Sequence, residues 1–301
     1  MSEAANRTAP VIKTRTTTTL ELDEGRNIAH AYTSQYQGFN QRGCLTSEII
    51  YDATGRAERK TLQTYDEAGR LVEQIVFVAH DQLLERTDHF FDDDGHLIRT
   101  EATQANGEKT IKEYYYDPVE NIGRAVLNSA SGQIKGYEIR WYDSSNEVIA
   151  EVRTDTNQRT AYKRFATYDG AGRLVMEEIF GYDEVFEKRT TYTYAPGGVL
   201  TAITTTGPQR RKLSTEKFTY NTPGQLVERA VTNHIEKTAM RFCYRYNDRG
   251  HQVADETYEG QRLIFRNFAK YDTHGTLTEE ELLSTGDTPF HAIRKHVVEY
   301  W

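Results

Sequence analysis

The sequence is organised by a short motif: an aromatic residue, Asp, two variable residues, Gly, a basic residue and Leu. It is most regular at Tyr168–Leu174 and Tyr65–Leu71, and it returns at Tyr220–Leu226 with Asn and Gln substituted. Successive aromatic positions lie 25 or 26 residues apart, at Phe39, Tyr65, Phe91, Tyr116, Tyr142, Tyr168, Tyr194, Tyr220, Tyr246 and Tyr271. A fixed period of this length indicates a repeat architecture, in which each unit buries its apolar face against its neighbours.

The motif predicts a tight turn between two antiparallel strands. Asp at the first position and Gly at the fourth suit a type I turn followed by a left-handed residue, and Gly adopts positive φ without steric cost. Such a hairpin places Asp opposite the basic residue and the aromatic opposite Leu on the buried face. We therefore expect these structural turn residues: Tyr65, Asp66, Gly69, Arg70, Leu71, Tyr168, Asp169, Gly172, Arg173, Leu174, Tyr220, Gly224 and Leu226.

The fold expected from this pattern is all-β, an antiparallel β-hairpin repeat meander of about ten 26-residue units in a curled, spiralling or barrel-like sheet. Residues 1–10 are expected to form a disordered N-terminal arm and residues 11–301 a single domain, opened by a degenerate hairpin from Val11 that caps the array. A second set of turns, between the motifs, varies in sequence, and variable loops on a rigid scaffold usually carry binding. The hairpin after Tyr116 departs from the rule, because its loop is two residues longer.

Composition limits the function classes. The hydrophobic fraction is 37% and the mean hydropathy is -0.73, which argues against a thick core. The net charge of -8 argues against general affinity for nucleic acid or an anionic membrane and favours a basic partner. Cys44 and Cys243 fall on different repeat positions, so no disulfide is expected. Without an apolar leader or a long apolar run, we expect a cytoplasmic protein.

Motifs that carry chemistry are missing from the sequence, so we expect no catalytic residue, no cofactor and no metal. Asp92–Gly95 resembles a calcium loop but occupies an ordinary repeat turn and lacks the alternating ligand spacing. His96 and His251 stand where other repeats carry Arg. The basic cluster Arg210–Lys212 is interpreted as a solvated strand edge rather than a nucleic-acid contact.

The tyrosines leave two interpretations open. Rows of exposed aromatic residues stack on sugars or anchor a protein partner, whereas the same spacing is explained by burial opposite Leu, which we favour. Trp141 and Trp301 would add to a carbohydrate-binding surface if they lie on the polar face.

The pattern at Tyr65–Leu71 and Tyr168–Leu174 resembles the YD repeat of the Rhs (rearrangement hotspot) family, whose members use spiralling β-sheets as shells in bacterial polymorphic toxins. The resemblance covers about Phe39 to Tyr300. It implies a YD-type sheet and a bacterial origin. The 26-residue period is longer than the family's usual one, ten hairpins are too few for a large shell, and no catalytic residue is carried over.

These observations favour a noncatalytic β-scaffold that binds another protein, plausible as an immunity or adaptor protein of a bacterial toxin system with a basic toxin as partner. The alternative is a carbohydrate-binding or cell-surface module that uses exposed Tyr and Trp. A third class, an enzyme in the mouth of the curled sheet, would require a deep pocket with perturbed carboxylates.

Overall fold

The computed structural model describes residues 11–301, and the arm predicted over residues 1–10 lies outside the described residues. The described chain is all-β, with 22 antiparallel strands and three short 3-10 turns. The predicted hairpin meander is therefore confirmed, with 22 strands where about 20 were expected. The chain divides into two compact units, one formed by residues 1–88, 245–256 and 263–301 and the other by residues 89–244 and 257–262.

The first unit holds the two ends of the chain. Its strands pair in the order β20, β21, β22, β1, β2, β3, β4, β5, β6. The bounds are β1 (Ile12–Leu22), β2 (Ile28–Phe39), β3 (Leu45–Tyr51), β4 (Ala57–Tyr65), β5 (Leu71–Val78), η1 (Ala79–Asp81), β6 (Gln82–Phe91), β20 (Arg262–Tyr271), β21 (Leu277–Ser284) and β22 (Phe290–Tyr300).

The second unit is an uninterrupted meander in which each strand pairs with the next along the chain. The bounds are β7 (Leu97–Gln104), β8 (Lys109–Asp117), β9 (Ile122–Ser129), β10 (Ile134–Tyr142), β11 (Val148–Thr154), β12 (Thr160–Tyr168), β13 (Leu174–Phe180), η2 (Tyr182–Glu184), β14 (Phe186–Tyr194), β15 (Leu200–Thr206), η3 (Pro208–Arg210), β16 (Lys212–Tyr220), β17 (Leu226–Asn233) and β18 (Thr238–Tyr246). β19 (Gln252–Glu259) has residues in both units.

The regular turns have the geometry that their sequence requires. In the Asp66–Arg70 turn the Gly69 amide donates to the Asp66 carbonyl, and Gly69 has φ +83°. The Arg70 guanidinium contacts the Asp66 carboxylate at 2.6 Å, and Tyr65 lies opposite Leu71. The hydrogen bonds from Arg70, first from its backbone amide and then from its side chain, lower the pKa of Asp66. The Asp is thus a turn residue that stays ionised.

The same arrangement recurs at the other two predicted motifs. Arg173 contacts Asp169 at 2.6 Å, Gly172 has φ +74°, and Tyr168 lies opposite Leu174. In the third motif Tyr220 lies opposite Leu226, and Gly224 has φ +86°.

The repeat tyrosines also connect consecutive hairpins. The Tyr65 hydroxyl donates to the Leu45 carbonyl at 2.9 Å, and the Tyr194 hydroxyl donates to the Leu174 carbonyl at 2.8 Å. The acceptor is the first residue of the returning strand in the preceding hairpin, and Tyr168 and Tyr271 reach corresponding carbonyls. We call the sheet face that bears these side chains the tyrosine face. Its tyrosines are half-buried, because each covers its neighbour rather than entering a deep core.

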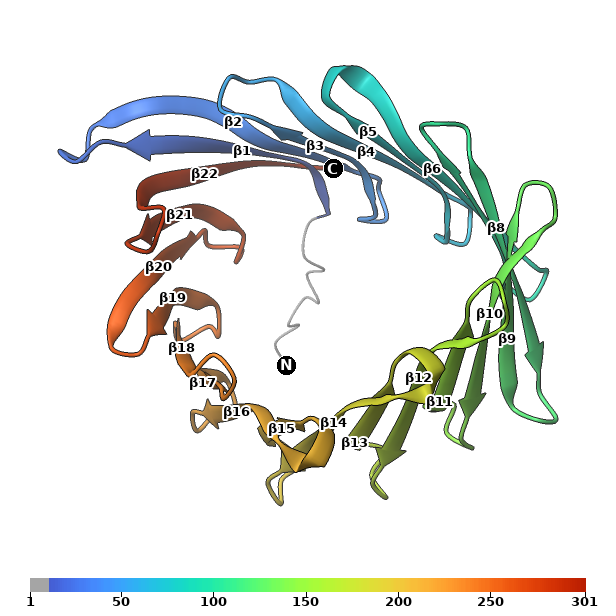
Figure 1. The fold of residues 1–301 in the computed structure, drawn as a ribbon. Helices are drawn as coiled ribbons and strands as arrows, with labels where there is room; N and C mark the ends of the chain where they lie inside the picture. Colours follow the sequence, from blue (N-terminus) through green and yellow to red (C-terminus); the bar gives the residue numbers. More distant parts are fainter. Residues whose placement is uncertain (1–10) are drawn as a thin grey trace, which may run out of the picture. The chain divides into compact units, whose positions relative to one another are not determined.

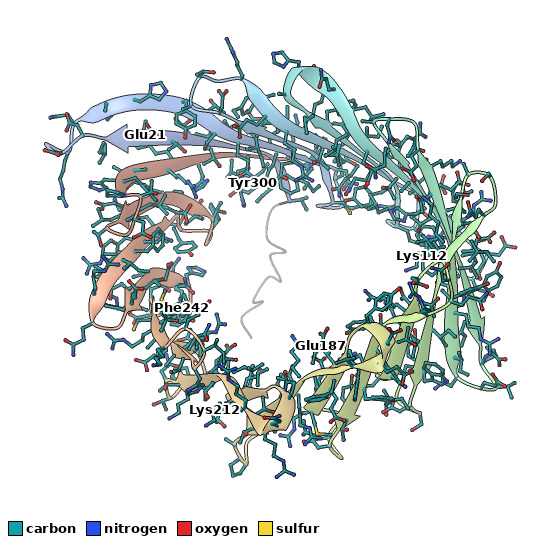
Figure 2. All side chains as sticks on the ribbon, viewed as in Figure 1. Glu21, Lys112, Glu187, Lys212, Phe242 and Tyr300 are labelled. Carbon is teal, nitrogen blue, oxygen red and sulfur yellow. The ribbon has the colours of Figure 1, made fainter. Side chains whose placement is uncertain are left out.

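Side chains leave both faces of each unit's sheet, and no second layer packs on either unit within residues 11–301 (Figure 2). No large side chain among these residues is completely buried, and the buried apolar residues are mostly alanines. Between the tyrosines and the middle of the strands, the tyrosine face carries paired charges, for example Arg164 with Glu177 at 2.6 Å. The buried face is therefore less apolar than the sequence pattern indicated. Cys44 and Cys243 form no disulfide.

The first strand completes the last hairpin (Figure 1). Tyr300 ends β22 as the earlier tyrosines end their strands, and it lies opposite Ile12 of β1, as Tyr65 lies opposite Leu71. The same one-residue register shift follows in both pairs. The amide of Trp301 donates to the carbonyl of Val11. The predicted opening hairpin is thus present, but β1 lies between β2 and β22 instead of capping an end.

The two glycines of one turn provide a test of the backbone argument. Gly172 has positive φ and Gly170 does not, while a Cβ at either position would meet nothing within 4 Å. Gly172→Val is expected to lower the free energy of unfolding by about 2 kcal/mol through backbone strain alone. Gly170→Ala, the matched control, is expected to change it by less than about 0.5 kcal/mol. Urea denaturation measures both, and equal losses would contradict the turn geometry.

Candidate functional site

The hairpin of β8 and β9 breaks the repeat. In regular hairpins the tyrosine at the strand end lies opposite Leu, but Tyr116 lies opposite Gly123 because the loop is longer. The Tyr116 hydroxyl does not reach back to the preceding hairpin and instead donates to Oδ1 of Asn121, within its own loop. Without a leucine neighbour, Tyr116 is 58% exposed. A side chain that is structural in other repeats is thereby presented to solvent.

Small residues on β9 leave a hollow between two strands with long side chains. Gly123 and Ala125 face Tyr116 and Tyr114 of β8 on one side, and β10 with Tyr142 flanks them on the other. These five residues line a hollow of about 630 Å³, which we call the tyrosine trough. The rings of Tyr116 and Tyr142 meet edge to face with centroids 6.2 Å apart. A Cβ on Gly123 would come within 3.1 Å of the Tyr142 hydroxyl, so Gly123 is needed for this close approach.

Charged side chains close one end of the trough. The Glu138 carboxylate forms ion pairs with Lys112 at 2.9 Å and with Arg140 at 2.6 Å. Lys112 is labelled in Figure 2. Burial raises the pKa of Glu138, but the hydrogen bond and charge of Lys112, together with Arg140, outweigh it and lower the pKa below its ordinary value. The carboxylate is ionised and paired. A general acid would need the opposite shift.

The rim of the trough is apolar and exposed. Of the lining residues, Tyr115 is 56% exposed and Ile98 of β7 is also exposed. Val119, which follows the lining residue Pro118 in the longer loop, is 92% exposed. Hydrogen bonds from the amides of Val119 and Glu120 to the Asp117 carboxylate hold the loop that presents Val119. Neighbouring exposed apolar side chains are characteristic of contact surfaces. The trough therefore offers a hollow with aromatic walls, and the loop that adjoins it presents an exposed aliphatic residue.

A group of possible metal ligands lies in the turn beside the trough. Ligand atoms of Asp92, Asp94 and His96 lie within 4.8 Å of one another. The Asp92 carboxylate accepts hydrogen bonds from the backbone amide of His96 and contacts its ring at 3.2 Å. These are the bonds of an ordinary repeat turn, with His in place of Arg. The expected absence of a metal stays a prediction.

The remaining candidates from the sequence lie apart from the trough. The turn residues of the three predicted motifs hold separate hairpins together and do not gather into one site. His251 stacks on Tyr271 with centroids 4.7 Å apart. Trp301 is 54% exposed beneath Lys13, and Trp141 is half-buried. Arg210 belongs to the short 3-10 turn before β16.

The trough lies at the end of the sheet formed by the regular turns, among them Asp92–His96 and Asp143–Glu147. The variable second set of turns, which predicted a binding site, lies at the opposite end of the strands. The lengthened loop after Tyr116 was a signal in the sequence, but it was interpreted only as a turn variant. The glycine opposite Tyr116 gives no such signal, because Ile122 stands at the motif's Leu position and only the register brings Gly123 opposite Tyr116.

Comparison with known proteins gives structural neighbours only. The sequence matches no protein-family profile and no curated protein. The fold resembles chains of the Photorhabdus luminescens Tc holotoxin pore (11% identity, TM-score 0.35, covering 94% of this chain) and of the TcdB2-TccC3 complex (11%, 0.32, covering 91%). This chain spans 18% of each of those chains.

A porin-like protein from Bacteroides uniformis is similar at 10% identity and a TM-score of 0.35, with 96% of this chain and 98% of that chain covered. At this level of similarity, none of the three carries an argument about function. None of the helices within residues 11–301 has the length and apolar character needed to cross a membrane.

Proposed function

We propose that this chain is a noncatalytic repeat scaffold that binds another protein through the tyrosine trough. The observation that carries the proposal is the broken repeat, in which Tyr116 lies opposite Gly123 instead of Leu and is exposed, as is Val119 in the loop that follows. Aromatic side chains in a partly enclosed hollow, ringed by other exposed groups, are typical anchors of protein interfaces. The paired state of Glu138 supports a binding rather than a catalytic role.

The partner that we propose is a basic protein, because the chain carries a net charge of -8 and opposite charges accelerate association. An immunity or adaptor role toward a basic toxin, in the cytoplasm, fits this charge and the YD-type motif. That step rests on the sequence resemblance and not on the trough. The alternative, a carbohydrate ligand, is favoured by one observation: Tyr114, Tyr116 and Tyr142 present ring surfaces around one hollow, as sugar-binding sites do.

A pull-down from the native host tests the trough. The tagged chain is compared with the double variant Tyr116→Ala/Val119→Ser, which is expected to retain its protein partner at least about tenfold less well, since two interface anchors each contribute about 1 kcal/mol or more. The matched control is Tyr182→Ala/Val185→Ser, which removes a similarly exposed pair from another loop. It should retain the partner as the unaltered chain does.

Equal capture by both double variants would contradict a trough-centred interface. Circular dichroism of the purified variants shows whether each keeps its sheet. If no protein is retained but a glycan array gives binding that Tyr116→Ala abolishes, the carbohydrate alternative replaces the proposal.

A further inference from the structure

The first half of β2 is a strand edge without a neighbour. β2 is 12 residues long and pairs with β1 from Ile28 to Gly38. β3 pairs only with Gln35–Phe39, so Ile28–Thr33 have no strand on that side within residues 11–301. Figure 1 shows the β1–β2 hairpin reaching past the end of β3. At ~3.3 Å per residue, this edge extends for roughly 20 Å.

A bulge at Ser34 of β2 lies next to the point where the pairing of β2 with β3 ends. The register of the β1–β2 pair shifts between Thr17 and Thr18, where Ser34 has no opposite residue. The Ser34 hydroxyl accepts a hydrogen bond from the Thr19 hydroxyl at 2.8 Å and donates one to the Thr17 carbonyl. A bulge bends its strand and increases its twist, and here it coincides with the end of the β2–β3 pairing, because β3 ends at Tyr51. The hydrogen bonds of Ser34 show that the edge is built into the hairpin.

This edge lacks the usual protection against strand addition. Ile28–Thr33 reads Ile-Ala-His-Ala-Tyr-Thr, with no Lys, Glu, Asp, Arg or Pro, and Ile28 is 60% exposed. Natural edge strands generally carry inward charges, prolines or covering loops. Beside the edge, the turn after β3 leaves a hollow of about 480 Å³ lined by His30–Thr33, Tyr51 and Ala53–Gly55. Within this lining, the His30 ring forms a hydrogen bond with the Ala53 carbonyl.

Acidic side chains outnumber basic ones around the edge. Burial raises the pKa of Tyr32, and the negative charges of Glu21, Glu58 and Asp52 raise it further, against the opposing charge of Arg294. Asp23 and Glu24 lie in the adjoining turn together with Arg26, and Arg56 closes the turn that begins at Asp52. The acidic groups near this edge, Glu21, Asp23, Glu24, Asp52 and Glu58, outnumber Arg26, Arg56 and Arg294, so a positively charged strand would fit it.

We propose that the Ile28–Thr33 edge binds an extended basic segment of another protein by β-strand addition. The segment would be about six residues long, since that is the length of the open edge. Backbone hydrogen bonds would supply affinity and the acidic surroundings would select Lys or Arg. This site is separate in the chain from the tyrosine trough, and the inference holds whether or not the trough binds a partner.

The probe is a fluorescent eight-residue peptide of alternating Lys and Val, titrated against the full chain at low salt by anisotropy. Hydrogen exchange is followed in parallel. Binding is expected to slow exchange at Ile28–Thr33 and not in the second unit. The same peptide with alternate N-methylated amides should bind at least about tenfold more weakly, since it lacks donors for the ladder. A Glu-for-Lys peptide should lose affinity similarly.

Glu58→Lys should lower the affinity for the Lys peptide by about threefold to tenfold. Glu147→Lys, an equal charge change in the second unit, should leave this affinity unchanged. Three results would overturn the proposal: no binding of the Lys peptide, equal binding of its N-methylated form, or protection outside Ile28–Thr33. Concentration-dependent self-association with exchange protection at the same six residues would assign the edge to a second copy of this chain instead.

Discussion

Removal of residues 1–22 is expected to unfold the first unit at 25 °C, which is the largest effect predicted for this chain. β1 forms nine residue pairs with β2 and nine with β22, so its loss opens two strand edges at once. It also removes the buried hydroxyls of Thr17 and Thr19, which bond to His296 on one side and Ser34 on the other. We expect the free energy of unfolding to fall by on the order of 5 kcal/mol or more, which equals the whole stability of many domains.

The measurement is urea denaturation by circular dichroism, with hydrogen exchange to separate the two units. In the truncated chain, amides of β2 and β22 should exchange without protection. Protection in β8–β18 should fall less, because those strands pair among themselves.

Addition of a synthetic peptide with the sequence of residues 11–22 should restore protection in β2 and β22, since β1 acts through backbone ladders that need no covalent link. A peptide carrying Thr17→Pro and Thr19→Pro is the control, because proline cannot donate to either ladder. If the truncated chain kept its full stability, or if both peptides restored it equally, the placement of β1 between β2 and β22 would be wrong.

Local chemistry made most of the fold predictable. The Asp-x-x-Gly spacing identifies the turn, and the aromatic six residues before Leu identifies the strand pair, so Tyr65 opposite Leu71 follows from sequence alone. The eleventh repeat was missed because Tyr300 lies 29 residues after Tyr271, behind the lengthened loop that begins at Ser284. Its partner Ile12 is at the other end of the chain, and no local pattern indicates so distant a pairing.

The site was less predictable than the fold. A glycine opposite Tyr116 has meaning only once the register is known, because a two-residue loop extension moves every later residue relative to its partner. The charges on the tyrosine face were also missed. Alternation predicts an apolar buried face when another layer covers it, but here the neighbouring side chains alone provide cover, and long Arg and Glu side chains can pair there while their charged ends stay near water.

Glu151→Ala is expected to be the most destabilising substitution among these charges, with a loss of about 3 kcal/mol. Glu151 is only 6% exposed. Its carboxylate accepts from Nε of Arg153 at 2.6 Å and lies 3.6 Å from Nε of Arg140, and Arg164 lies opposite it in the β11–β12 ladder. Removal of this carboxylate leaves Arg140 and Arg153 to share Glu138, while Arg164 keeps its pair with Glu177. The arginines are partly exposed, which limits the loss to the lower end of the range for a broken buried pair.

The matched control is Glu147→Ala, an exposed glutamate in the turn just before β11, which should change the free energy of unfolding by less than about 0.5 kcal/mol. Glu151→Gln keeps the shape and hydrogen-bonding capacity but not the charge, so it should cost about 2 kcal/mol. Because Arg140 and Arg153 are then neutralised by Glu138 alone, 1 M salt should reduce their repulsion and recover part of the loss in Glu151→Ala, and it should change the Glu147→Ala chain little, since the Debye length falls to about 3 Å. Urea denaturation at both salt concentrations tests this. Equal losses for the two alanine variants, or a loss that salt leaves unchanged, would contradict a role of Glu151 as a counter-charge of Arg140 and Arg153.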